Sequence, residues 1–465
     1  MDMTDFKKIW KEHYQIVPQQ LKNIKKVKSI ATGFNTNIDA IYKITGKKLA
    51  TLIKKYGLSL KDLQNIERCR ILDKKDFVKG VFKSFTLGIA EEWICENKKV
   101  YEWLQKEIGY DFLQIGGQGG IIANVLSAVG VKKVFVHANS LPKLQAEQFE
   151  KNKNLLSFDE KGEIKPAYQI DRKKDLPLIH WIIEFGRGDT IEIEGQIFKT
   201  PKANRFIATY DPLNLKLVLD ENFMTDIKKE KLDFVVLSGF HALLANNDGV
   251  ILIDKASERI KAWKEGAKGT IFHLEIASTQ DIVIRKAIVQ KLVPLADSIG
   301  INERETIDLL EVLDEKVLAK RCNEETTAEN LLKGISKIKE KTGVKRIQLH
   351  MFGLYLTLQD KGFVIEPESN FKGMLTASVV AASKAEKGKI DSKSIKSVDY
   401  DISDVGLIEL DSLASTLGQP KLAVNGLGRY RNWDLIAVPT ILIEKPISLV
   451  GMGDTISSIS LISAR

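Results

Sequence analysis

Short apolar runs rich in β-branched residues alternate with longer amphipathic stretches along most of the chain. The apolar runs include 131–139, 269–278 and 344–359, while 256–268 and 327–343 repeat apolar residues at helical spacing. Buried strands separated by helices of this length are typical of an α/β fold with a mostly parallel sheet. The pattern therefore predicts a large α/β domain whose sheet is flanked by helices.

A different pattern occupies two inserted segments. Residues 162–211 are rich in β-forming pieces, and polar and apolar residues alternate in TIEIEGQI, as in a half-exposed strand. Residues 33–115 separate what we interpret as early strands of the large sheet. We expect both segments to form a smaller β-rich lid domain. The predicted division is 1–34, 116–161 and 212–465 for the large domain, and 35–115 and 162–211 for the lid.

Bulk composition fits a folded protein with more than one compact core. The 465 residues are 44% hydrophobic and 28% charged. No run approaches the roughly 18 consecutive apolar residues of a membrane span, and the N-terminal segment lacks the apolar centre of a signal peptide. Cys69, Cys95 and Cys322 are far apart and form no metal-binding pattern. We expect a cytoplasmic protein.

The charge balance bears on the class of partner. The net charge is +9, but the lysines are spread along the chain and interleaved with 61 acidic residues. Nucleic-acid binding usually needs a concentrated basic patch. We therefore expect no nucleic-acid partner, and the excess of positive charge suits anionic small substrates equally well.

Glycine-rich segments exclude two common nucleotide-binding classes. The patterns GxxxxGK[ST] and GxGxxG are absent, which argues against P-loop NTPases and ordinary Rossmann dehydrogenases. Two GxGD segments remain. The segment 186–189 precedes a strand pattern and predicts a turn, whereas 451–454 follows ISLV, interpreted as a strand, and precedes a helix pattern. A helix start offers free N–H groups to an anion. Asp454 is then either a catalytic group or a simple N-cap.

Two carboxylates follow apolar runs. His273 and Glu275 share a face of a predicted strand because side chains alternate with period two, and Glu305 follows another probable strand end. Ligands of open α/β sheets bind at the carboxyl ends of the strands. Glu275 and Glu305 either hold a hydrated Mg²⁺ or are surface charges and helix caps.

Two further segments offer groups that bind hydroxyls. Gly116–Gly120 brings Gln118 to a predicted helix start, and the segment 33–39 carries Asn35 and Asp39. The alternatives are a tight helix start without a ligand and a capped turn.

The order NxNxD, GGQxG, HxExAS, NExE, VP and GxGDT resembles the archaeal ADP-dependent glucokinase and phosphofructokinase family of the ribokinase-like superfamily. The lysine- and isoleucine-rich composition is similar to the methanococcal branch, whose enzyme is expected to accept both fructose 6-phosphate and glucose. The resemblance implies a ribokinase-like large domain with a β-rich lid. It also implies transfer of the β-phosphoryl group of ADP to the sugar, which releases AMP.

The resemblance assigns roles by position. Asp454 is expected to be the catalytic base, with the N–H groups of Gly451 and Gly453 facing the phosphoryl group. Glu275 and Glu305 are expected to position Mg²⁺, or another divalent cation, through its waters. The expected sugar-binding residues are Asn35, Asp39, Gly117 and Gln118. The expected nucleotide-binding residues are Asn302, His350, Gly353, Val438 and Met452.

Substrate choice depends on a second group of residues. A dianionic sugar phosphate needs cations, and Lys165, Arg187 and Arg205 are candidates, with strand-surface charge as the alternative. Glucose needs a carboxylate instead, and Glu91 or Glu92 lies where the family places one. The presence of both sets favours dual specificity.

Other functions stay open at this point. A monofunctional glucokinase or phosphofructokinase differs from the dual enzyme in its rates with the two sugars. An ATP-dependent carbohydrate kinase differs in its donor. A non-catalytic ribokinase-like module that binds RNA would show salt-sensitive binding without turnover. The oligomeric state is not predicted.

Overall fold

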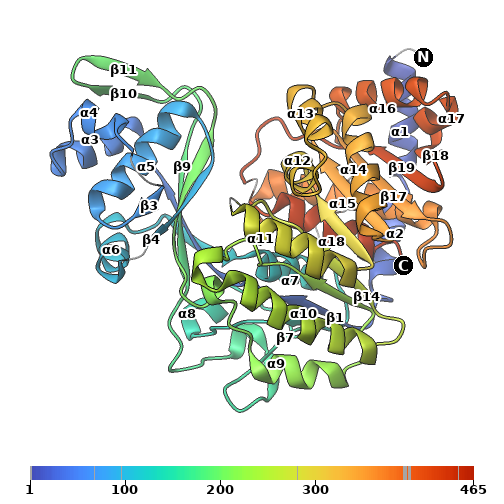
Figure 1. The fold of residues 1–465 in the computed structure, drawn as a ribbon, viewed down its shortest axis with the longest axis horizontal. Helices are drawn as coiled ribbons and strands as arrows, with labels where there is room; N and C mark the ends of the chain where they lie inside the picture. Colours follow the sequence, from blue (N-terminus) through green and yellow to red (C-terminus); the bar gives the residue numbers. More distant parts are fainter. Residues whose placement is uncertain are drawn as a thin grey trace.

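The computed structural model describes residues 3–66, 69–95, 97–279, 281–390, 395, 400–448 and 450–465. The chain forms two bodies, each built on its own sheet (Figure 1). We call them the large body and the small body. Each has a separate hydrophobic cluster, which contains Phe135 and Trp263 in the large body and Trp181 and Phe206 in the small one.

The large body is built on an eleven-stranded sheet. The six consecutive pairings from β7 to β16 are parallel, and antiparallel strands continue the sheet at both edges. In spatial order the strands are β18 (Leu427–Tyr430), β19 (Trp433–Pro439), β17 (Leu354–Asp360), β16 (Arg346–Met351), β15 (Ser298–Ile301), β14 (Ile271–Glu275), β13 (Phe234–Leu237), β1 (Ile30–Gly33), β6 (Val134–Val136), β7 (Leu155–Phe158) and β8 (Ile164–Pro166).

Helices cover both faces of the large sheet. On one face α7 (Gln118–Ala128), α15 (Pro367–Lys387) and α18 (Met452–Ile462) pack together. On the other lie α10 (Gly249–Gly266), α11 (Ile282–Ala287), α12 (Glu303–Val312), α13 (Lys316–Glu324) and α14 (Ala328–Thr342). The remaining helices of this body are α1 (Met3–Tyr14), α2 (Val17–Ile24), α8 (Lys143–Ala146), α9 (Glu221–Asp226), α16 (Asp404–Thr416) and α17 (Pro420–Asn425).

The small body has a six-stranded sheet with helices on one face (Figure 1). In spatial order its strands are β3 (Arg70–Ile71), β4 (Glu91–Cys95), β12 (Asn204–Tyr210), β9 (Ile179–Phe185), β2 (Asn37–Lys43) and β5 (Phe112–Gly116). A hairpin of β10 (Thr190–Ile193) and β11 (Gln196–Lys199) extends from it. Its helices are α3 (Gly46–Lys55), α4 (Leu60–Gln64), α5 (Lys74–Leu87) and α6 (Lys98–Trp103).

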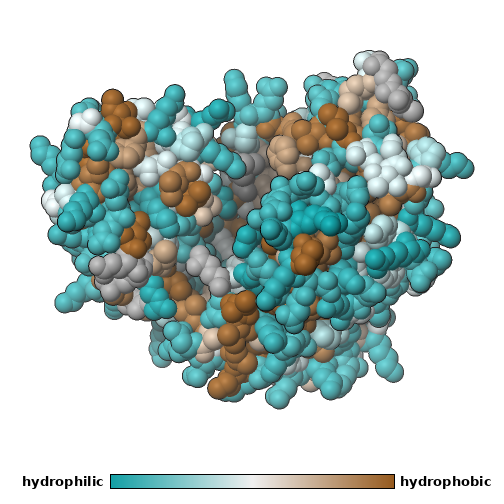
Figure 2. Space-filling view, turned by 45° about the horizontal axis from the view of Figure 1, so that its top comes forward, coloured by the Kyte–Doolittle hydropathy of each residue, from teal (hydrophilic) through white to brown (hydrophobic). Residues whose placement is uncertain are grey.

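The chain passes between the two bodies four times, at 34–36, 117, 170–178 and 211–213. These connections hold the bodies side by side, and the surface is hollowed between them, at the upper centre of Figure 2. Among the described residues, no helix is both long and apolar enough to cross a membrane.

The helix predicted at 327–343 matches the structure closely. It is α14, which begins after Thr327 because the Thr327 side chain accepts a hydrogen bond from the Asn330 N–H. The apolar run 344–359, however, is two antiparallel strands, β16 and β17, joined by a turn at Phe352 and Gly353.

Two local expectations were wrong. The strand interpreted before Gly451 is absent, since the described residues 446–448 and 450 are turn and coil. β8 lies inside the segment assigned to the lid. It nevertheless belongs to the large sheet, where it pairs with β7 and places Pro166 opposite Leu156. Alternating polarity marks an exposed strand but not the sheet to which it belongs.

Candidate active site

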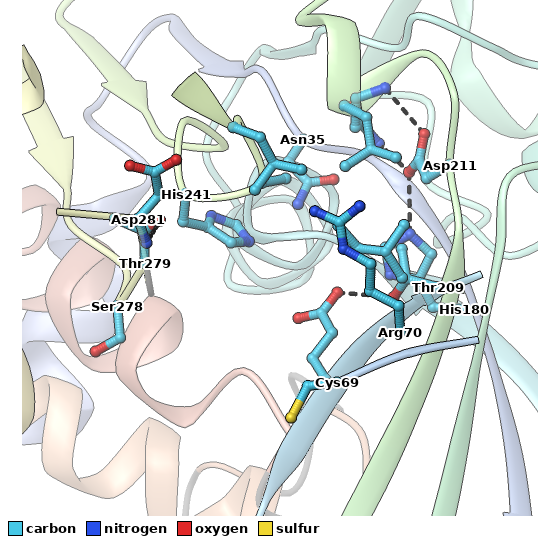
Figure 3. A pocket seen from close by; sticks show the side chains of 16 residues that line it. Asn35, Cys69, Arg70, His180, Thr209, Asp211, His241, Ser278, Thr279 and Asp281 are labelled. Atoms are coloured by element: carbon cyan, nitrogen blue, oxygen red, sulfur yellow. Dashed lines mark hydrogen bonds and ion pairs between the residues drawn. The ribbon is translucent and has the colours of Figure 1, made fainter. Parts of the chain in front are cut away.

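A cavity of about 340 Å³ lies where the two bodies meet. Asn35 and His241 point into it from one side, and Arg70 and His180 from the other (Figure 3). Its lining residues are Asn35, Cys69, Arg70, Glu92, Ile94, His180, Thr209, Asp211, Asn214, Leu215, His241, Ala242, Leu244, Ser278, Thr279 and Asp281.

The wall formed by the small sheet is ordered by strand register. Thr209 on β12 is opposite His180 on β9. Ile94 lies beside Thr209 on β4, and Asp39 lies beside His180 on β2. Paired residues of neighbouring strands point to the same face. These four side chains therefore form one row across the sheet.

The row carries a charged pair. His180 Nε2 lies 3.0 Å from Asp211 Oδ2, so the imidazole is held by a buried carboxylate (Figure 3). Burial alone lowers the pKa of His180, but the bond to Asp211 and the nearby charges of Glu92 and Asp39 outweigh it, and the pKa is raised. Burial raises the pKa of Asp39, although the charge of His180 opposes the shift. His180, which lines the cavity, thus keeps its proton more readily, and Asp39 lies next to it in the same row.

The structure distinguishes the two adjacent glutamates. Glu91 Oε1 is 2.5 Å from Lys83 Nζ, and Glu91 Oε2 accepts a bond of 2.9 Å from Trp93 Nε1. Both oxygens of Glu91 therefore have partners inside the small body. Glu92 points the other way, lines the cavity, and accepts a bond of 2.7 Å from Thr209 Oγ1. Glu92 is the glutamate that can reach a ligand.

The predicted hydroxyl-binding residues meet at the same place. Gly117 is the residue before α7, and Gln118 opens that helix. A Cβ on Gly117 would lie 2.6 Å from the Asn35 carbonyl oxygen, so the two segments touch. Among the described residues, Asn35 Oδ1 and Gln118 Oε1 are buried and have no hydrogen-bond partner. Unpaired buried acceptors are costly, and sugar hydroxyls would satisfy them.

Asp454 lies in the first turn of α18, and Gly451, not Asp454, is the N-cap. The alternative of Asp454 as a simple cap is therefore wrong. Gly451 has φ of 64°, and a Cβ there would lie 2.7 Å from Ile121. A Cβ on Gly453 would lie 2.8 Å from His350 Nε2. Both glycines let the turn pack tightly, with the helix N–H groups free at its start.

The environment of Asp454 suits a base that must ionise in a dry site. Asp454 is 8% exposed. Burial raises its pKa, while the charge of Lys384 and a hydrogen bond from the Gln118 side chain act in the opposite direction. Gln118 therefore connects the carboxylate to the hydroxyl-binding segment around Asn35. The site has a carboxylate, free amides at a helix start, and unpaired acceptors beside it.

Glu275 ends β14 in a crowded polar cluster. His273 Nε2 lies 3.2 Å from Glu275 Oε2 and 2.9 Å from Ser457 Oγ on α18. Burial raises the pKa of Glu275 well above its ordinary value, and the charge of Asp454 adds to the shift. The predicted shared face of His273 and Glu275 is present, and it points to the helix that carries Asp454.

Glu305 lies in the first turn of α12 and forms a capping box with Asn302. Its Oε2 accepts a bond of 2.8 Å from the Asn302 N–H. Burial raises the pKa of Glu305 to about 8, and the charge of Asp454 contributes. The alternative that Glu305 is a helix cap is therefore correct for its Oε2 atom.

Electrostatics determine whether a cation fits here. Glu275, Glu305 and Asp454 are all buried, and each of the two glutamates has its pKa raised partly by Asp454. Burial is the largest cause of both shifts, so the two glutamates tend to keep their protons, and a cation bound nearby would favour their ionised forms. Among the described residues, no three His, Cys, Asp or Glu side chains are placed to hold a metal directly. A cation that keeps its waters and is oriented by two carboxylates fits this arrangement.

The predicted nucleotide-binding residues are scattered around this edge. Asn302 caps α12, and Met452 opens α18. His350 is buried beside Gly453, and its Nδ1 has no partner among the described residues. Gly353 forms the turn after β16, but Val438 lies in the large hydrophobic core and is fully buried. Nothing in its surroundings marks Val438 as a contact residue.

The predicted phosphate-binding cations are not together. Lys165 lies on the edge strand β8, with its Nζ 2.5 Å from Asp159 and 2.7 Å from Glu163. Arg187 is exposed in the turn between β9 and β10. Only Arg205 shares the face of Thr209, four residues along β12, which is about 13 Å. Of the three candidates, Lys165 and Arg187 therefore match the surface-charge alternative, and Arg205 stays a candidate for the sugar phosphate.

The cavity contains polar residues that the sequence analysis did not identify. Arg70, His180 and His241 line it, and Lys384 lies beside Asp454. None of them belongs to a glycine-rich motif. The pattern IHWIIEF, a histidine in an otherwise apolar strand, was the one available signal for His180.

Comparisons with known proteins agree on one class. A family model described as the ADP-specific Phosphofructokinase/Glucokinase conserved region matches residues 28–463. The chain is 32% identical over 464 residues to an ADP-dependent glucose/glucosamine kinase of Pyrococcus furiosus, covering 97% of each chain. It is 30% identical to an ADP-specific phosphofructokinase of Pyrococcus abyssi, covering 92% of this chain and 96% of the relative.

A solved structure supports the same class. It is an ADP-dependent kinase in complex with fructose-6-phosphate and ADPβS, which superposes with a TM-score of 0.85 at 29% identity. The match covers 100% of this chain and 98% of that one.

Proposed function

Since the chain belongs to the ADP-specific phosphofructokinase/glucokinase family and is an ADP-dependent sugar kinase, we propose that it phosphorylates both fructose 6-phosphate and glucose. The products are fructose 1,6-bisphosphate or glucose 6-phosphate, and AMP. The fold is the ribokinase-like α/β fold expected from the sequence, with a large mostly parallel sheet and a smaller mixed one. We further propose that the small body is a lid over the large one.

The observation that carries the proposed kinase chemistry is the hydrogen bond between the side chains of Gln118 and Asp454. It joins the hydroxyl-binding segment to the carboxylate at the start of α18. A sugar hydroxyl bound beside Gln118 would lie within reach of Asp454, which would remove its proton as it attacks phosphorus. The amides of Gly451 and Gly453 would stabilise charge on the transferring phosphoryl group.

Two further carboxylates take part in the proposed mechanism. Glu275 and Glu305 would orient a hydrated Mg²⁺ beside the diphosphate of ADP, and the cation would in turn favour the ionised forms of these buried carboxyl groups, whose pKa values are raised. When bound, the cation neutralises charge on the phosphoryl oxygens. The residues of the chain thus supply position, a proton acceptor and charge balance, which is most of what phosphoryl transfer needs.

Dual specificity is supported by the composition of the cavity wall. Glu92 lines the cavity and offers a carboxylate to a glucose hydroxyl. Glu91 does not, because its carboxylate is bonded to Trp93 inside the small body. The same wall carries Arg70, and Arg205 lies farther along the same sheet face. A sugar phosphate could pair with these cations. Relatives act on each class of sugar separately, one as a glucose/glucosamine kinase and one as a phosphofructokinase.

The test is AMP production from ADP with Mg²⁺, measured in parallel with fructose 6-phosphate and with glucose. ATP serves as the alternative donor. AMP formed with both sugars supports dual specificity. Activity with one sugar alone would contradict it and leave a monofunctional kinase of the same family.

A further inference from the structure

Lys384 lies in the last turn of α15, packed beside the turn that opens α18. Its ammonium group bonds to the carbonyl oxygens of Val450 at 2.7 Å and Gly451 at 3.1 Å. A third bond of 3.3 Å reaches Thr455 Oγ1, and Thr455 in turn donates to Gly451 O at 2.7 Å. One cation therefore binds both ends of the glycine turn.

We propose that Lys384 is a positioning residue for phosphoryl transfer, whose ammonium group fixes the carbonyls of the glycine turn so that the amides of α18 stay aimed at the phosphoryl group. A peptide carbonyl and the next N–H point in opposite directions, so restraining one restrains the other. Preorganised donors lower the barrier only when they do not have to move during the reaction. This inference rests on the proposed function.

The glycine at position 451 allows the close approach of Lys384. A Cβ on Gly451 would lie 3.0 Å from Lys384 Nζ and 2.7 Å from Ile121, so the glycine permits the ammonium to approach. Burial lowers the pKa of Lys384 to about 8, while the charge of Asp454 opposes the shift. The three oxygen partners of the ammonium group offset part of the cost of removing it from water.

The matched control is Lys387, one turn of the same helix away and exposed. Lys384→Ala should lower kcat roughly a hundredfold with both sugars, the loss expected for a small misplacement of catalytic groups. The KM values should change little, because the lost effect acts on the chemical step. Lys387→Ala should behave as wild type.

Chemical rescue separates positioning from general damage. Lys384→Ala removes a propylammonium fragment, and Lys384, Val450 and Ile121 line a cavity of about 220 Å³ through which a small amine can reach the site. Added n-propylammonium should restore part of kcat in Lys384→Ala and change nothing in Lys387→Ala. Loss of kcat that n-propylammonium does not restore at any concentration would overturn the proposal.

Hydrogen exchange provides a readout that does not depend on turnover. The amides of 450–458 should exchange faster in Lys384→Ala than in wild type or Lys387→Ala. Lys384→Met, which keeps the packed stem without the charge, should show the same increase if the alanine variant is unstable. Equal exchange in all four proteins would overturn the proposal. A wild type that forms no AMP would refute the proposed function instead, and exchange would still decide the role of Lys384.

Discussion

The edge of the large sheet and the face of the small sheet carry polar sites of different construction. At the edge, Glu275 ends a strand, while Glu305 and Asp454 each lie in the first turn of a helix. On the face, Asp39, His180 and Thr209 come from three strands and are aligned by register. The first site is set by local chain geometry, and the second by pairing between distant segments.

The difference suggests a division of labour. In the proposed mechanism the edge groups surround the phosphoryl group as it moves from ADP to the sugar, with three buried carboxylates and one adjacent ammonium group. The face groups vary in charge along the strands, with Glu92 in one row and Arg205 in the next row of the same face. Substitutions at the edge should affect both sugars equally, whereas substitutions on the face should discriminate between them.

The largest expected effect is at Asp454. Asp454→Asn should lower kcat roughly 10²–10⁴-fold with both sugars, because it removes the proton acceptor. Affinity for ADP, measured by calorimetry, should be largely kept. Near-normal turnover would show that Asp454 is not the base. A loss confined to one sugar would contradict the expectation that substitutions at the edge affect both sugars equally.

Glu275→Gln tests the charge balance of the edge. Activity should fall roughly 10–100-fold with both sugars, the range seen when groups that orient a metal are lost. Raising the Mg²⁺ concentration in the rate assay should recover part of the loss. No dependence on Mg²⁺ beyond that of wild type would argue that Glu275 serves only to hold His273 and Ser457.

Arg205→Ala should lower kcat/KM for fructose 6-phosphate by roughly 10–100-fold, the loss of a charge-assisted bond worth ~1.5–3 kcal/mol. Glucose use should change little. Arg187→Ala is the control, since Arg187 is exposed at the far hairpin. If Arg205→Ala and Arg187→Ala behave alike, Arg205 does not bind the sugar phosphate, and Arg70, which lines the cavity, becomes the residue to test.

The smallest effect distinguishes the adjacent glutamates. Glu92→Gln should raise the KM for glucose roughly tenfold, as one hydrogen bond weakens, and spare fructose 6-phosphate. Glu91→Gln should leave both KM values unchanged and lower the melting temperature instead, because it disturbs the contacts with Lys83 and Trp93. The reverse result would assign the sugar contact to Glu91.

The sequence predicted the edge better than the face. Asp454, Glu275 and Glu305 lie at strand ends and helix starts, which hydrophobic periodicity and glycine motifs can locate. Lys384 lies 70 residues before Asp454 in sequence, and nothing local connects them. The α/β fold class was confirmed because it depends on the alternation of strands and helices alone.

The residues of the face were harder to predict because the local sequence does not determine which strands pair or in which register. His180 meets Asp39 only through the pairing of β9 with β2. Lys165 and Arg187 carried the expected charge, but one lies on an edge strand of the large sheet and the other at a hairpin turn. Charge alone does not tell which face or which body a strand residue occupies.

The strand order of the small sheet has a consequence for folding. The segment 37–116 supplies β2, β3, β4 and β5, but β12 and β9, from 179–210, lie between β4 and β2. Until the second segment arrives, the first can form only two separate strand pairs at the sheet edges. The chain between the two segments builds β6, β7 and β8 of the other sheet. Closing such a long loop is slow, so we expect the small sheet to be completed late in folding.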